Sequence, residues 1–192
     1  MEISRRTVLL TAAGTTLGAG AGALGTYFAT RPGGQAEDVA APEDLMREHG
    51  VLNRILLIYE EGLRRLGANQ DIAAEVFRQP ADLVRQFVED YHEHLEEQFI
   101  FPEFEQRQQM VELVQTLRRQ HQAGRRVTDI ILSHTAADQF RQPTRRQELR
   151  EAVQAFIRMY RPHETREDTV LFPAFRKIVS AAKIKELVVD VL

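Results

Sequence analysis

The sequence contains no cysteine. This absence excludes disulfide bonds, thiolate metal ligands and thiol catalysis. Any metal ion in this protein must therefore be held by nitrogen and oxygen donors. Tryptophan is absent as well, and the ten Phe and four Tyr residues are an ordinary aromatic supply that indicates no particular activity.

The chain also lacks a block of basic residues. It has 25 Lys and Arg against 28 Asp and Glu, a formal net charge of −3, and its Arg and Glu residues alternate along the sequence. Nucleic-acid binding requires clustered positive charge on one face. We therefore exclude nucleic acid as a partner.

The composition favours helix throughout. Apolar residues make up 43% of the 192 residues and charged residues 28%, with heavy use of Leu, Glu, Arg, Gln and Ala, which are strong helix formers. This length suits one domain plus an appendage. The sequence therefore predicts an all-α protein.

Four long amphipathic segments follow Pro42. Their approximate spans are 43–66, 80–106, 109–134 and 144–176. Four long helices with short connections predict an up-down-up-down four-helix bundle over residues 43–177. Residues 178–192 contain a further short apolar pattern and are expected to form a C-terminal helix that docks on the bundle.

Residues 1–34 resemble a twin-arginine export signal. Arg5 and Arg6 stand directly before the stretch 7–30, which is rich in Gly, Ala and Thr and has no charge, a pattern typical of such signals. The resemblance implies an exported, periplasmic or otherwise extracytoplasmic protein, and the export route carries proteins already folded, often with a cofactor. About 24 uncharged residues could just span a bilayer, so membrane attachment through an uncleaved segment stays open as an alternative to cleavage. Residues 35–42 are interpreted as a linker.

The second and fourth predicted helices share a local pattern. When residues 91–104 are laid on residues 162–175, six of the fourteen positions are identical. The identical pairs are His92/His163, Glu93/Glu164, Glu96/Glu167, Phe101/Phe172, Pro102/Pro173 and Phe104/Phe175. Moreover, His49 lies 43 residues before His92, and His121 lies 42 residues before His163. The chain thus contains two copies of one helical hairpin.

In each copy, a carboxylate follows a histidine at a spacing that suits a shared ligand. Residues advance by about 100° on a helix, so Glu96 lies about 40° round from His92 and one turn along. The same holds for His163 and Glu167. Apolar residues on the same faces indicate that these faces are inward. They are Val84, Val88, Leu95 and Phe99 beside His92; Ala152, Phe156, Met159 and Val170 beside His163; Leu45, Leu52 and Leu56 around His49; and Met110, Val114, Leu117 and Thr128 around His121.

Four imidazoles and two carboxylates buried together are unfavourable without a counter-charge, because burying an unpaired charge is very costly. A pair of cations bridged by Glu96 and Glu167 resolves this. Nitrogen and hard oxygen donors without sulfur suit iron, with manganese as the second choice. A polar core network without metal is the alternative.

The arrangement resembles the hemerythrin family in its bacterial HHE cation-binding form, over about residues 43–177. The family's ligand pattern is matched in order by His49, His92, Glu96, His121, His163 and Glu167, and the Phe-Pro after each His-x-x-x-Glu is a further family mark. The resemblance implies a carboxylate-bridged pair of iron ions.

One position departs from this pattern. Hemerythrins carry a second histidine four residues after the ligand on the third helix, where this chain has Arg125. A guanidinium stays protonated and cannot be a ligand. Glu93 and Glu164 are therefore candidates for additional ligands. The departure favours an open coordination position or a carboxylate-rich site over simple oxygen carriage.

Several neighbouring residues are expected to have other roles. His94 and His134 are expected to face solvent, and Tyr160 is a candidate hydrogen-bond donor near the site. Glu97 and Asp168 are expected to support the ligands or lie at the surface. Pro102 and Pro173 are expected to kink or end their helices.

Three functions follow as hypotheses. The first is a di-iron protein that binds or reacts with a diatomic ligand (O2 or NO) or with peroxide, which leaves open whether it is an enzyme. The second is an iron- or metal-handling bundle that binds cations without ligand chemistry. The third is a purely structural bundle. The sequence does not indicate a redox partner.

Overall fold

The computed structural model describes residues 40–180 and 182–184. Every regular element within these ranges is helical, which confirms the predicted all-α class for this part of the chain. The predicted export segment, residues 1–34, lies outside the described residues, as does much of the linker (35–42) and of the C-terminal segment (178–192).

The described residues form four long helical segments. The first is α3 (Ala41–Gly67), and the second runs without a break through α4 (Glu75–Leu83), η1 (Val84–His92), α5 (Glu93–Leu95), η2 (Glu96–Ile100) and α6 (Phe101–Gln106). The third is α7 (Val111–His134). After the short α8 (Ala137–Phe140), the fourth runs through α9 (Pro143–Arg166), η3 (Glu167–Leu171) and α10 (Phe172–Ile178).

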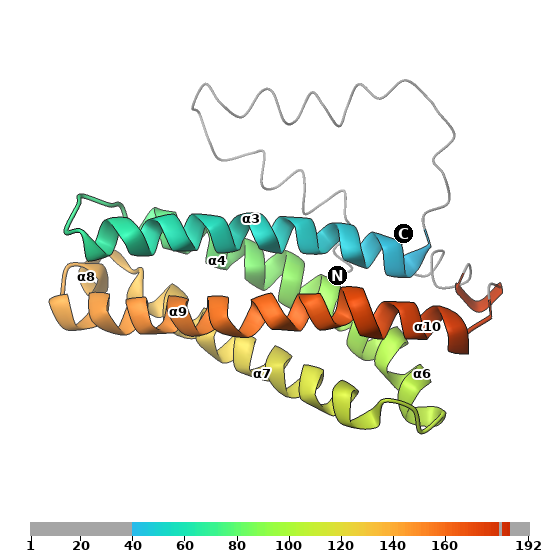
Figure 1. Cartoon of the computed structure of the whole chain (residues 1–192). Helices are drawn as coiled ribbons and strands as arrows, with labels where there is room; N and C mark the ends of the chain where they lie inside the picture. The colour runs from blue at the N-terminus through green and yellow to red at the C-terminus, as the bar shows by residue number, and fades with distance from the viewer. Residues whose placement is uncertain (1–39, 181, 185–192) are drawn as a thin grey trace, which may run out of the picture.

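These segments pack in a ring. Helix α3 contacts α4 and α9, and α7 contacts the same two helices from the other side. In Figure 1 the chain crosses the view back and forth, and the start of α3 lies at the same end as α6 and α10. Each segment therefore turns one face toward the centre.

Two apolar cores fill this centre, one toward each end. The first core includes Leu52, Leu56, Tyr59, Phe77, Val84, Val88, Ile131, Phe156 and Tyr160, and the second includes Leu45, Ile100, Phe101, Phe104, Leu117, Leu171, Phe172 and Phe175. Along each segment the predicted ligands lie between residues of one core and residues of the other. The polar residues are thus enclosed by apolar packing on both sides.

The second segment begins earlier than predicted, at Glu75 rather than at residue 80. Pro80 lies inside this helix and is buried. The predicted span starts at this proline, and proline is common in the first turn of a helix. Burial of Phe77 and Ala81 beside it explains why the helix extends further back.

The second and fourth segments widen into π-helical turns around the predicted ligands. The turn η2 ends just before Phe101-Pro102, and η3 ends just before Phe172-Pro173. Proline has no N–H, and its ring collides with the carbonyl four residues back, so the α-helical hydrogen-bond register is lost there. A wider turn lets the helix continue past it. The repeated proline thus accounts for equivalent wide turns in the two hairpins.

Two residues predicted to face inward do not. The side chain of Val170 is 42% exposed, because it lies in η3, where the widened turn changes the direction of each side chain. Leu171 is buried in its place. Met110 lies just before α7 with a left-handed backbone (φ 49°) and is 37% exposed.

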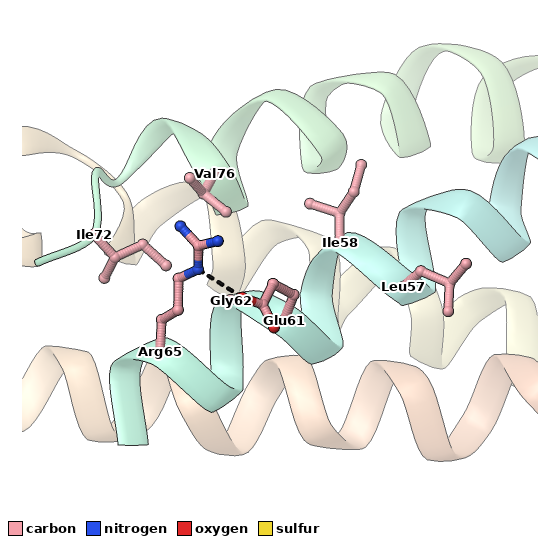
Figure 2. A pocket seen from close by; sticks show the side chains of 7 residues that line it. All are labelled: Leu57, Ile58, Glu61, Gly62, Arg65, Ile72 and Val76. Atoms are coloured by element: carbon pink, nitrogen blue, oxygen red, sulfur yellow. Dashed lines mark hydrogen bonds and ion pairs between the residues drawn. The ribbon is translucent and has the colours of Figure 1, made fainter. Parts of the chain in front are cut away.

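Among the described residues, no helix is both long and apolar enough to cross a membrane. A groove of about 350 Å³ lies between the second half of α3 and the start of α4. Figure 2 shows its lining by Leu57, Ile58, Glu61, Gly62, Arg65, Ile72 and Val76. Glu61 and Arg65 form an ion pair of 2.7 Å there, so the groove offers an apolar surface with its two charges already paired.

Candidate metal centre

The structure brings all six predicted ligands together in the centre of the bundle. Each has an exposed fraction of at most 3%. His49 comes from α3, His92 and Glu96 from the second segment, His121 from α7, and His163 and Glu167 from the fourth segment.

The four imidazoles meet in two pairs. The Nε2 atoms of His49 and His92 lie 3.0 Å apart, and those of His121 and His163 lie 3.2 Å apart. We call these the His49 pair and the His121 pair. Metal–nitrogen bonds are about 2.0–2.1 Å long, so nitrogens at these separations can share one cation within each pair.

The two carboxylates connect the pairs. Glu96 has Oε1 at 3.8 Å from His92 Nε2 and Oε2 at 3.4 Å from His121 Nε2. Glu167 has Oε2 at 3.4 Å from His49 Nε2 and Oε1 at 3.1 Å from His163 Nε2. Each carboxylate thus turns one oxygen toward each pair, which is the arrangement of a bridging ligand.

The missing hydrogen bonds of the carboxylate oxygens also fit a metal site. Both side chains are fully buried, yet all four oxygens of Glu96 and Glu167 have no hydrogen-bond partner among the described residues. Leaving a buried polar group without a partner costs about 1–3 kcal/mol, and more when it is charged. Cations between these oxygens and the imidazole nitrogens would satisfy them. The buried His and Glu groups could therefore hold metal ions.

The outer ring nitrogens hold the imidazoles in place. Nδ1 of His49 donates to Asp168 at 2.8 Å, and Nδ1 of His121 donates to Glu97 at 2.8 Å. A proton fixed on Nδ1 leaves Nε2 unprotonated, so the lone pair of Nε2 faces the centre and can bind a metal ion. Asp168 and Glu97 thus support the histidines, one of the two roles expected from the sequence.

Two further supporting residues were not predicted. Nδ1 of His92 donates to Glu48 at 2.9 Å, and Nδ1 of His163 donates to the amide oxygen of Gln120 at 3.0 Å. Glu48 and Gln120 each stand directly before the first histidine of their hairpin. The repeated pattern did not mark them, because the two residues differ and lie outside the duplicated windows 91–104 and 162–175.

Arg125 lies beside the His121 pair. Its Nη2 lies 3.0 Å from Glu93 Oε2 and 3.0 Å from Glu97 Oε1. The other oxygen of Glu93 accepts a hydrogen bond of 2.8 Å from Tyr160, which confirms the predicted hydrogen bond of Tyr160 near the site. Burial raises the pKa of Glu93 despite the opposing charges of His121 and Arg125.

The remaining candidates lie further out. Glu164 is 5% exposed and accepts a hydrogen bond of 3.0 Å from Asn53. Burial raises the pKa of Glu164 to about 7. His94 is exposed, as predicted. His134 was expected to face solvent, but it is only partly exposed and contacts Glu148 at 2.7 Å, because the turn after α7 brings α9 against it.

Burial and neighbouring charge set the protonation of the cluster. Burial raises the pKa of Glu96, and the Glu167 carboxylate raises it further. For Glu167 burial is the largest single effect, but His163, His121 and His49 together outweigh it and lower its pKa. Burial alone would lower the pKa of His49, but Asp168 and Glu167 raise it to about 10, whereas burial lowers the pKa of His163 to about 3. In the other pair, nearby carboxylates, Glu93 foremost, raise the pKa of His121 well above its usual value despite burial. Without a cation, each side therefore binds a proton in its place, on His49 in one pair and on His121 in the other.

Comparison with known families agrees with this geometry. The sequence model of the hemerythrin HHE cation binding domain matches residues 40–139 and, in a second match, residues 112–191. The second match begins in α7, where the second hairpin starts. Two overlapping matches are what an internally duplicated chain would give.

Curated relatives include one protein of Mycobacterium bovis and one from each of two Mycobacterium tuberculosis strains, CDC 1551 and H37Rv. Each is described as an uncharacterized protein and is 51% identical over 154 residues. The match covers 80% of this chain and 60% of each relative. No solved structure matches the chain.

Proposed function

Since this chain belongs to the hemerythrin HHE cation-binding domain family, we propose that it is a non-haem di-iron protein that binds or reacts with O2, nitric oxide or peroxide outside the cytoplasm. The bundle in this proposal has the up-down-up-down topology of hemerythrin. The observation that carries the proposal is the pairing of four buried imidazoles across two carboxylates whose oxygens accept no hydrogen bond from the described residues.

One cation would lie in each pair. The ligands of the first would be His49 and His92, those of the second His121 and His163, and each cation would also take one oxygen from Glu96 and one from Glu167. This N2O2 donor set, free of sulfur, suits iron, with manganese as the alternative. Bound iron would supply one-electron redox chemistry and a position for a small ligand.

The surrounding residues prepare the site for such a ligand. The two apolar cores exclude bulk water from both sides. Arg125 stands where hemerythrins have an additional histidine, so the cation position at the His121 pair would have two nitrogen ligands rather than three. Glu93 remains a candidate for a further ligand, because one of its oxygens lies within 4.8 Å of ligand atoms of Glu97 and His121. Glu164, its counterpart in the other hairpin, is the second candidate.

The location outside the cytoplasm is supported by the twin-arginine-like pattern at Arg5 and Arg6. Replacement of both arginines with lysine should keep the protein in the cytoplasm, as seen by cell fractionation and immunoblotting. Fractionation of the wild type also distinguishes a released protein from a membrane-attached one. Export that persists in the double variant would overturn this part of the proposal.

The ligand chemistry is tested on the full chain expressed with iron. We expect about two irons per chain by metal analysis and an absorption spectrum that differs between argon, O2 and nitric oxide. Oxygen evolution on addition of peroxide would identify an enzyme. Iron that exchanges readily and whose absorption spectrum does not change with any added ligand would indicate cation binding alone. A protein that takes up no metal would refute the proposal.

A further inference from the structure

The hydrogen bonds on the outer nitrogens differ between the two histidine pairs. In the His49 pair both rings donate to carboxylates, His49 to Asp168 at 2.8 Å and His92 to Glu48 at 2.9 Å. Glu48 is itself buried, with 8% of its surface exposed, so solvent screens its charge very little. Both imidazoles of this pair are thus supported by negative charge.

In the His121 pair, one support carries no charge. Nδ1 of His163 donates to the amide oxygen of Gln120 at 3.0 Å. Gln120 is the counterpart of Glu48, since each directly precedes the first histidine of its hairpin. The two hairpins therefore differ at this position by the exchange of a carboxylate for an amide of nearly the same shape.

The other support of this pair is shared with a cation. Glu97 Oε1 accepts from His121 Nδ1 at 2.8 Å and also lies 3.0 Å from Arg125 Nη2. The guanidinium partly neutralises the carboxylate, which weakens its effect on the imidazole. The His121 pair is therefore supported by one neutral amide and one carboxylate whose charge is partly neutralised by Arg125.

An anionic acceptor on Nδ1 makes the opposite nitrogen a stronger metal donor. We infer that the two cation positions are unequal: the position of the His49 pair fills first and binds more tightly, and the position of the His121 pair binds the weaker, exchangeable cation. This inference rests on the proposed function, because it requires a cluster that holds two cations. A chain in scarce metal would then hold one cation, and the second position would respond to the supply.

The test is a titration of the metal-free full chain with Zn²⁺, which has no redox chemistry, by calorimetry in the presence of a competing chelator. We expect two binding steps whose affinities differ by about 10-fold or more, since loss of an outer hydrogen-bond partner typically changes metal affinity by about 10–100-fold. Glu48→Gln should weaken the tighter step by about 10–100-fold and leave the weaker step in place. Gln120→Glu, the matched reverse change, should strengthen the weaker step.

The possible outcomes separate the two ideas. Two steps of equal affinity in the wild type, or two variants that shift the same step, would overturn the inequality and leave the two-cation centre intact. A complete lack of zinc uptake would overturn the proposed function as well. Thermal unfolding of each metal-free variant checks the fold. If Glu48→Gln does not fold, Asp168→Asn changes the partner of His49 at a site that is 32% exposed and should weaken the same step.

Discussion

The packing of α7 against α9 depends on the absence of a side chain at Gly124. A Cβ atom there would lie 2.2 Å from the hydroxyl oxygen of Tyr160 and 2.9 Å from its Cζ. Tyr160 is 1% exposed and donates a hydrogen bond of 2.8 Å to Glu93. A shift of the ring away from a Cβ atom at position 124 would therefore strain this hydrogen bond. Gly124→Ala is the sharpest test of the packing.

The magnitude combines three effects. Alanine gains about 1 kcal/mol over glycine inside a helix. Overpacking costs about 1–3 kcal/mol, and loss of the hydrogen bond on a buried carboxylate costs about 1–3 kcal/mol. With central values, Gly124→Ala should lower the free energy of unfolding by about 3 kcal/mol.

Urea unfolding of the metal-free protein, followed by circular dichroism, measures this change. Gly50→Ala in α3 is the control, because its Cβ would meet nothing closer than Arg54 Nη1 at 3.5 Å, and it should be neutral or slightly stabilising. Adding Tyr160→Phe to Gly124→Ala removes the atom in closest contact and should cost less than the sum of the two single changes. A Gly124→Ala protein as stable as the wild type would refute the contact between Gly124 and Tyr160.

Three further outcomes are expected. Burial raises the pKa of Glu89 from 4.5 to about 7 in the folded protein. Between pH 4.5 and pH 7, Glu89 therefore takes up a proton when the protein folds, and stability falls as the pH rises through this range. Glu89→Gln should remove this part of the slope, worth up to about 3 kcal/mol, and unfolding curves at pH 4.5 and 8 that differ equally in both proteins would contradict this. His92→Ala should abolish stoichiometric metal binding in metal analysis, whereas the exposed His94→Ala should not; equal losses would show that the inward face is wrongly assigned. Arg125→His should add a nitrogen donor and change the absorption spectrum of the iron-loaded protein, and an unchanged spectrum would show that the new ring does not reach the metal.

The cluster of histidines and carboxylates could be predicted because its ligand pattern occurs twice in the sequence. His92 and His163 recur with a carboxylate four residues on, and the same spacing brings His and Glu to one face even where the helix widens. The widened turns move other side chains more. Val170 therefore faces outward although its position in an α-helical pattern is inward.

Other features of the structure depend on contacts between helices, which sequence periodicity does not reveal. Nothing in the local sequence indicates that Arg125 lies against Glu93 and Glu97, or that Gly124 makes room for Tyr160. Such contacts depend on how deeply two helices approach one another. The start of the second segment at Glu75 likewise depends on the burial of Phe77 in the core rather than on a local start signal.

The position of the metal is tested most directly by X-ray diffraction from crystals of the iron-loaded protein, with data collected at the iron absorption edge. We expect two anomalous difference peaks inside the bundle, one between His49 and His92 and one between His121 and His163, both in contact with Glu96 and Glu167. A protein with no peak there, or with iron bound only at the surface, would contradict the assignment of these residues as the metal centre.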